Sequence, residues 1–296
     1  MKYFIILTIL FILLPSCGED TKSKANKVNK LEVLAIKVDK PQAHPGDVII
    51  ANSLVGHPED YSNEFHTIWF LCNPSDNSGF KSCMSEDGII GLPTIDNNEF
   101  HFTVPADVLS QGAKNKKLYI LFTICEADMQ KCQDTMMNEA GNGLESDLFR
   151  FSYKTVEIVQ DSMPIMNHNP KIKSIYLNGE ELTSSDISLK ARENDKENNK
   201  NDNIFKAEVT SDSFDEIKTP KGEKDFESIV LVWKSTLGDI KYYYTDQKHD
   251  EKLSDLDENP FNTALKSEVD TYHIYIIAID NRGGVDWKVL NITNEK

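Results

Sequence analysis

The sequence predicts an all-β protein built from two β-sandwiches in tandem. Short runs of β-branched and aromatic residues recur between turn signals, whereas helical periodicity is scarce. These runs are spread evenly over both halves of the 296 residues, and a chain of this length suits two domains better than one. We expect the two domains to occupy residues 31–160 and 171–296.

The chain starts with a predicted secretory leader over residues 1–16. Lys2 precedes an apolar run from Tyr3 to Leu14, which is too short to span a bilayer because a spanning helix needs about 20 apolar residues. Leu14-Pro15-Ser16-Cys17 resembles a bacterial lipobox, in which a peptidase cuts before the cysteine and its thiol receives diacylglycerol. Cys17 is therefore the predicted lipid anchor. The alternative is an ordinary secretory signal followed by an unmodified cysteine.

Residues 17–30 are mostly polar and contain no aromatic residue. Such a segment buries too little apolar surface to offset the entropy lost when it becomes ordered. We therefore expect a flexible tether that holds the folded domains away from the lipid surface.

Six strands are expected in the first domain and seven in the second. The first six are 31–38, 47–55, 65–72, 99–104, 117–125 and 148–159. The other seven are 171–179, 186–191, 205–211, 228–236, 240–246, 271–280 and 285–293. Paired prolines predict a turn at 41–47 and an interdomain linker at 161–170. The sequence Asn281-Arg282-Gly283-Gly284 predicts a hairpin turn in which both glycines have positive φ.

The two halves share an order of landmarks. A tryptophan strand, with Trp69 in the first half and Trp233 in the second, is followed later in each half by a strongly apolar strand that contains tyrosine. This order matches strands C and F of an immunoglobulin-like sandwich, in which the tryptophan is a core residue.

The mature chain resembles two-domain, immunoglobulin-like envelope lipoproteins of Gram-negative bacteria, a group whose molecular role is largely undefined. In the first half the resemblance rests on the lipobox at Cys17, on Pro45-Gly46-Asp47 before a strand, and on Trp69 with Cys72. In the second half it rests on Asn169-Pro170 and on the run from Asp280 to Trp287. The resemblance implies the fold and a lipid-anchored location at the outer membrane, and it implies no activity.

Four cysteines remain after Cys17: Cys72, Cys83, Cys125 and Cys132. An even number in an exported chain predicts two disulfides, whereas a zinc site needs cysteines in closer pairs. Strand alternation places Cys72 and Cys125 on the outer face of their strands, so neither can bridge the core. The pairs Cys72–Cys83 and Cys125–Cys132 are favoured over Cys72–Cys125 with Cys83–Cys132.

No catalytic motif is present in the sequence. The chain lacks G-x-S-x-G, H-E-x-x-H and the phosphate-binding G-x-x-x-x-G-K-[ST], and its 7 histidines are scattered. We therefore expect no enzymatic activity and no cofactor. The formal net charge of −16, which becomes more negative once Lys2 leaves with the leader, argues against nucleic acid as a partner.

Calcium is the metal for which the sequence offers ligands. The acidic run at 255–259 fails as an EF-hand loop because Pro260 and Lys266 stand where glycine and glutamate are required. The run 193–203 fails in the same way. Its four carboxylates remain weak candidates for a calcium site of another geometry: Glu193, Asp195, Glu197 and Asp202.

Tyr242, Tyr243 and Tyr244 are consecutive in one expected strand, so at least one of them points outward. Such tyrosines mark either a sugar- or protein-binding face or the packing of an edge strand. The expected function is that of a non-enzymatic envelope lipoprotein that binds an envelope protein or polysaccharide. The alternatives are a structural spacer in an envelope assembly and a calcium-dependent adhesion module.

Overall fold

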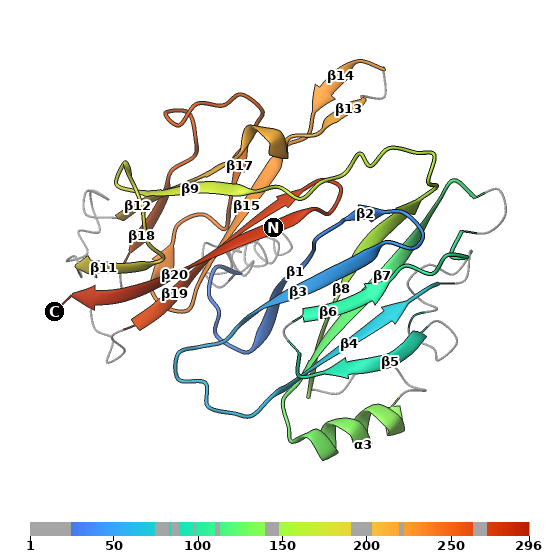
Figure 1. Ribbon diagram of the computed structural model, residues 1–296. Coiled ribbons are helices and arrows are strands. Elements are labelled where there is room, and N and C mark those ends of the chain that lie inside the picture. Colours follow the sequence, from blue (N-terminus) through green and yellow to red (C-terminus); the bar gives the residue numbers. More distant parts are fainter. Residues whose placement is uncertain are drawn as a thin grey trace, which may run out of the picture.

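The computed structural model describes residues 25–74, 83, 89–97, 99–109, 113–139, 148–190, 203–218, 222–262 and 271–295. Within these ranges the chain is mostly β-strand and forms two sandwiches that lie side by side (Figure 1). The predicted all-β class is therefore confirmed. Among the described residues no helix is long and apolar enough to cross a membrane.

The first sandwich packs a three-stranded sheet on a five-stranded one. The smaller sheet has the order β1 (Glu32–Val38), β3 (Val48–Gly56), β6 (Glu99–Thr103). The larger sheet has the order β2 (Gln42–Ala43), β8 (Phe149–Val159), β7 (Asn115–Cys125), β4 (His66–Cys72), β5 (Ile89–Ile95).

The second sandwich packs two five-stranded sheets. One has the order β10 (Glu180–Glu181), β9 (Ile172–Leu177), β12 (Asn203–Val209), β18 (Asn259–Asn262), β16 (Asp239–Ile240). The other has the order β11 (Asp186–Lys190), β20 (Val285–Glu295), β19 (Thr271–Asp280), β15 (Ile229–Ser235), β17 (Tyr244–Gln247). Between β12 and β15 the chain forms a short 3-10 helix, η3 (Ser211–Ser213), and a hairpin of β13 (Glu216–Lys218) and β14 (Lys224–Phe226), which projects from the sandwich in Figure 1.

Both sandwiches have the strand order of an immunoglobulin-like domain. In each one, the first strand pairs with the next long strand, β1 with β3 and β9 with β12. A segment between those two strands crosses to the other sheet and pairs in parallel with the last strand, β2 with β8 and β11 with β20. The tryptophan strand lies beside the apolar strand, β4 beside β7 and β15 beside β19, as expected for strands C and F.

Each sandwich has its own core, centred on a buried tryptophan. The ring of Trp69 stacks on Phe100 with 5.8 Å between the ring centroids, and Trp233 lies 6.5 Å from Phe205. Each indole N–H donates a hydrogen bond of 2.9 Å, to the carbonyl of Asn97 and to Oγ1 of Thr245 respectively. Because a buried donor without an acceptor is costly, these bonds fix the orientation of the two rings.

Both favoured disulfides are present, Cys72–Cys83 and Cys125–Cys132. The cysteines pack in clusters separate from the core, on the other face of the five-stranded sheet, and are nevertheless buried. The second bridge fastens α3 (Met129–Glu139), a helix that was not expected from the sequence. Asp128 caps this helix by accepting the backbone N–H of Lys131 at 2.9 Å.

Residues 25–30, the end of the expected flexible tether, belong to the folded structure, whereas residues 17–24 lie outside the described residues. Asn26 and Val28 are buried, and Lys27 forms a parallel bridge with Ser235 at the end of β15. The side-chain amide of Asn26 also donates to the carbonyl of Ile240 at 2.7 Å. Burial and hydrogen bonds offset the entropy of ordering this segment, so the folded part of the chain includes residue 25 onward.

Three other expectations need correction. The predicted strand 240–246 is split, because the chain crosses from β16 in one sheet to β17 in the other. Strands β5 and β18 and the β13–β14 hairpin were not predicted. In the β19–β20 turn only Gly283 has positive φ, at +90°, whereas Gly284 is required for space. A Cβ on Gly284 would lie 2.8 Å from the carbonyl oxygen of His168 and would collide with the carboxylate of Asp280.

An apolar cluster joins the two sandwiches. Val28 and Leu54 pack in one cluster with Tyr275, Ile277 and Val285 of β19 and β20. Two ion pairs also link the domains, Lys37 to Asp286 at 2.7 Å and Lys234 to Glu32 at 2.9 Å. The interface therefore combines burial of apolar surface with charge pairing.

The linker is tied to both domains by Asn169. Its side-chain amide donates to the carbonyl of Val38 at 2.6 Å, and its side-chain oxygen accepts the backbone N–H of Val285 at 2.9 Å. Asp286 adds a further bond on the second domain by accepting the N–H of Ile172 at 2.9 Å. The residues from Asp280 to Trp287, which carry part of the family resemblance, thus form the junction between the domains.

The tip of the β19–β20 turn carries a cluster of buried charge. Arg282 pairs with Asp215 at 2.5 Å and with Glu227 at 3.1 Å. Lys154 of β8 reaches across from the first domain and donates to the carbonyl of Gly283. Burial lowers the pKa of Lys154 to about 8, and the nearby carboxylate of Asp280 opposes that shift. Burial likewise raises the pKa of Glu227, although Arg282 opposes it.

Candidate binding surface

A pocket of about 600 Å³ opens on the outer face of the β9–β12 pair. Strand β12 directs Phe205, Ala207 and Val209 into the core, so Ile204 and Lys206 point to the opposite side. The two walls of the pocket come from these strands and from the segment before β18. The lining residues are Tyr176, Asn178, Gly179, Ile204, Lys206, Leu253, Ser254 and Glu258.

The lining of this pocket combines apolar and charged side chains. Leu253 is 40% exposed, and Ile204 lies on the outer face of β12, where the next two side chains on that face, Lys206 and Glu208, are charged. Lys206 and Glu258 form an ion pair of 3.4 Å at the wall. Apolar walls with a few polar groups bind and orient a ligand. Among the lining residues there is no cysteine, histidine or serine–base pair suited to nucleophilic catalysis.

Tyr176 is positioned by a charged partner. Its hydroxyl donates to Glu208 of β12 at 2.9 Å, and burial together with this carboxylate raises the pKa of the phenol. Glu208 is also paired with Lys173 at 2.9 Å. The hydroxyl is therefore already bonded, and the ring is the part of Tyr176 available to a ligand.

A second pocket of about 360 Å³ adjoins the first, since Glu258 lines both. Its aromatic wall is formed by Tyr242 and Tyr244, and its acidic wall by Asp257 and Glu258. Tyr242, Tyr243 and Tyr244 are 45%, 40% and 60% exposed. The expectation that at least one of these tyrosines points outward is therefore exceeded, because all three do.

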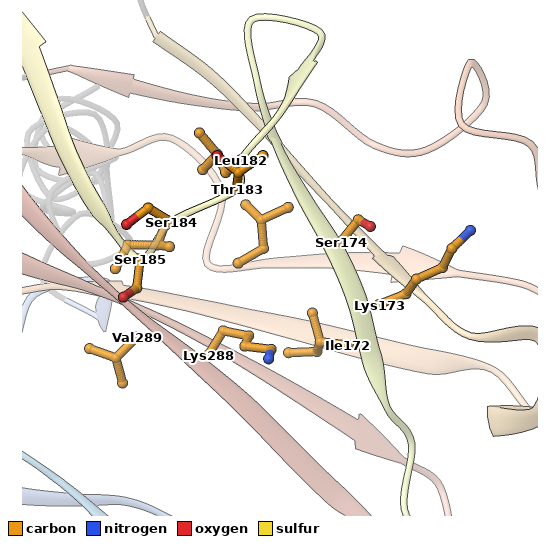
Figure 2. A pocket seen from close by; sticks show the side chains of 11 residues that line it. Ile172, Lys173, Ser174, Leu182, Thr183, Ser184, Ser185, Lys288 and Val289 are labelled. Carbon is orange, nitrogen blue, oxygen red and sulfur yellow. The ribbon is translucent and has the colours of Figure 1, made fainter.

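A third pocket lies at the edge of the second sandwich, between β9 and β20 (Figure 2). Hydroxyls of Ser184 and Ser185 and the ammonium of Lys288 line it, whereas Lys173 extends away towards its partner Glu208. Its volume is about 200 Å³, which is below the range of about 300–1,000 Å³ typical of ligand sites. It is the weaker candidate.

Of the binding residues suggested by the sequence, Tyr242 and Tyr244 line the second pocket. Cys17 and the weak calcium candidates Glu193, Asp195, Glu197 and Asp202 lie outside the described residues. Within the described ranges, no group of three or more His, Cys, Asp or Glu side chains could hold a metal ion. The larger pocket, called here the Ile204–Leu253 pocket, was not predicted. The sequence contains one indication of it, because Ile204 alternates with Lys206 and Glu208 on the polar face of the strand.

No protein-family model and no curated protein sequence matches the chain. Solved structures that are similar include the D0-D1 domain of intimin, with 9% identity, a TM-score of 0.24, and coverage of 88% of this chain and 98% of that one. Another is the Ig1-2 module of the Drosophila receptor protein tyrosine phosphatase DLAR, with 9% identity, a TM-score of 0.26, and coverage of 90% of this chain and 100% of that one. A third is a 1.5-MDa bacterial ice-binding adhesin, with 9% identity, a TM-score of 0.21, and coverage of 90% of this chain and 65% of that one. Because these TM-scores are low, the assignment of an immunoglobulin-like fold rests on the strand order described above.

Proposed function

We propose that this protein is a lipid-anchored, non-enzymatic protein of the bacterial envelope whose paired sandwiches bind an envelope protein or a surface polysaccharide. The observation that carries the binding function is the pocket between Ile204 and Leu253, open on the outer face of the second sandwich. Its volume lies within the range of ligand sites, and its strands belong to a hydrogen-bonded sheet that holds the walls in place.

Two features support the location at the envelope. The leader and the lipobox-like Leu14-Pro15-Ser16-Cys17 indicate export and anchoring. The bridges Cys72–Cys83 and Cys125–Cys132 are of the kind that persists in oxidising compartments such as the periplasm or the cell surface.

A structural spacer is the second candidate, and the junction between the domains favours it. Leu54 and Tyr275 pack in a shared apolar cluster, and Lys37–Asp286 pairs the domains at 2.7 Å. A junction of this kind resists hinge motion, which suits a protein that holds two other components at a fixed separation.

The test uses the mature protein as bait for solubilised envelope proteins and for purified envelope polysaccharide. Leu253→Glu places a charge in the pocket, and Val48→Glu makes the same kind of change at a site that is 52% exposed on the first sandwich. We expect Leu253→Glu to weaken capture at least about tenfold, corresponding to about 1.4 kcal/mol, and Val48→Glu to leave it unchanged. Equal capture by both variants would show that the pocket is not the binding site.

A further inference from the structure

The N-terminal segment lies in line with β17 along one edge of β15. Strand β17 pairs with β15 up to Tyr244, and the next bond along the same edge runs from the N–H of Trp233 to the carbonyl of Tyr243 at 2.9 Å. Beyond it, the N–H of Ser235 donates to the carbonyl of Asn26 at 2.8 Å, and Ser235 accepts from the N–H of Val28 at 2.9 Å. The chain therefore enters the fold beside Tyr243.

Two side-chain contacts fix the same position from the other sheet. Asn26 bonds to the carbonyl of Ile240, and Lys27 pairs with Asp239 at 2.8 Å. Both partners belong to β16, which immediately precedes Lys241 and the three tyrosines. The entry point and the exposed tyrosines are thus neighbours in space, although more than 200 residues separate them in sequence.

The distance from this entry point to the predicted anchor is short. Eight residues lead from Ala25 back to Cys17. At roughly 3.3–3.6 Å per residue, a fully extended chain of that length reaches about 26–29 Å. If Cys17 carries lipid, the bilayer lies within that reach of Ala25, and the tyrosines lie on the same side of the fold as Ala25.

The surface at this point has the chemistry of a membrane interface. Tyr242, Tyr243 and Tyr244 expose amphipathic rings, which favour the headgroup level of a bilayer. Lys241 is exposed, with Nζ 5.2 Å from the ring centroid of Tyr242, and a lysine beside aromatic rings can reach lipid phosphates. Asp257 and Glu258 lie nearby, so insertion of the rings rather than net charge would supply the attraction.

We propose that Lys241, Tyr242, Tyr243 and Tyr244 contact the lipid headgroups next to the anchor, so that the second sandwich rests on the membrane. This inference rests on the proposed lipid anchor at Cys17. It assigns the exposed tyrosines to a lipid surface, whereas the Ile204–Leu253 pocket remains the site for the protein or polysaccharide partner.

The experiment uses the full lipidated chain in vesicles of phosphatidylethanolamine and phosphatidylglycerol, with and without brominated acyl chains. Tyr244→Trp places a fluorescent reporter at the proposed contact. Tyr153→Trp is the matched control, because Tyr153 is 50% exposed on the first sandwich. The signal of the parent chain, which contains Trp69, Trp233 and Trp287, is subtracted from both.

We expect the brominated lipid to quench the reporter at 244 and its emission to shift to the blue, with neither effect at 153. Equal quenching at both positions, or none at 244 in protein that floats with the vesicles, would overturn the contact and leave the anchor intact. Loss of captured protein partner on Tyr244→Ser without quenching at 244 would assign the tyrosines to a protein interface instead. If the chain fails to float, the anchor and this inference both fall.

Discussion

Asn26 donates its side-chain amide to the backbone carbonyl of Ile240, 214 residues further along the chain, at 2.7 Å. This bond places the end of the polar N-terminal segment in the second sandwich, although the first sandwich follows it directly in sequence. The segment then passes Val28 into the apolar cluster between the domains before β1 begins. The N-terminal segment therefore contacts both domains.

The first prediction concerns the packing of this N-terminal segment. Val28→Ala removes two methyl groups from a fully buried site and should lower the free energy of unfolding by about 1–2.5 kcal/mol. Val48→Ala is the control, since Val48 is 52% exposed, and should change stability far less. Calorimetry of the unlipidated mature chain measures both. An equal, small effect of the two variants would mean that the N-terminal segment does not contribute to the folded unit.

The second prediction concerns α3 and the bridge that holds it. Replacing Cys125 and Cys132 by alanine opens a loop with a sequence separation of 7 and should cost about 2–3 kcal/mol in the first sandwich. The second sandwich contains no cysteine, so its melting transition should move much less. Reductant added to the parent chain should likewise lower the melting transition of the first sandwich more than that of the second. A larger shift of the second transition would contradict this account.

Much of the fold could be predicted because strand alternation is a local property. In β7, Leu118, Ile120, Phe122 and Ile124 form the core face, which correctly leaves Cys125 outside the core. The helix α3 was missed because most of its residues are polar, and among its described side chains, residues 129–135, only Cys132 is buried. Strand β18 was missed because it begins Asn259-Pro260, which reads as a turn.

The N-terminal segment and the binding pocket could not be predicted for a different reason. The average composition of residues 17–30 is polar and predicts a flexible segment. A single apolar residue, Val28, is nevertheless buried and holds the end of this segment against the fold. The pocket depends on Leu253, in the turn before β18, and Ile204 of β12 lining the same cavity although they are far apart in the sequence. Local sequence patterns predict tertiary contacts of this kind only weakly.

The third prediction tests the space around Gly284. A Cβ at this position would meet the carboxylate of Asp280 and would lie 2.9 Å from Cδ of Pro170. Gly284→Ala should therefore cost about 3 kcal/mol, because the turn and the linker must separate. Gly179→Ala serves as control: its φ is +89° but nothing lies within 4 Å of the new Cβ, so only backbone strain of about 1 kcal/mol is expected. Similar losses in urea unfolding would argue against close packing at Gly284.

The fourth prediction tests the anchor. Cys17→Ser removes the predicted lipid attachment site, so the variant should accumulate as unprocessed or soluble protein. The parent chain should incorporate labelled palmitate and enter the detergent phase on phase separation. Cys125→Ala with Cys132→Ala controls for loss of other cysteines and should label like the parent. Equal partitioning of parent and Cys17→Ser would refute anchoring at this residue.

The last prediction is a dependence of stability on pH that arises from Lys154. Its pKa is about 8 in the folded protein and about 10.4 when it is unfolded. Between these values the unfolded chain binds more protons than the folded chain, so stability rises with pH. The slope is about 0.7 kcal/mol per pH unit at pH 8, where Lys154 is half protonated in the folded protein, and rises to about 1.2, which amounts to about 1.6 kcal/mol between pH 8 and 9.5.

Lys154→Met keeps an unbranched side chain one atom shorter and removes the titrating group, so the rise should disappear in the variant. Burial also raises the pKa of Tyr272 and of Tyr275, and their effect on stability, a loss with rising pH, begins near pH 9 and is common to both proteins. Chemical unfolding of both proteins at half-unit steps from pH 7.5 to 9.5 therefore isolates Lys154. Parallel curves for parent and variant would show that the ammonium of Lys154 is not desolvated at the junction, and the contact with Gly283 would then be a surface contact.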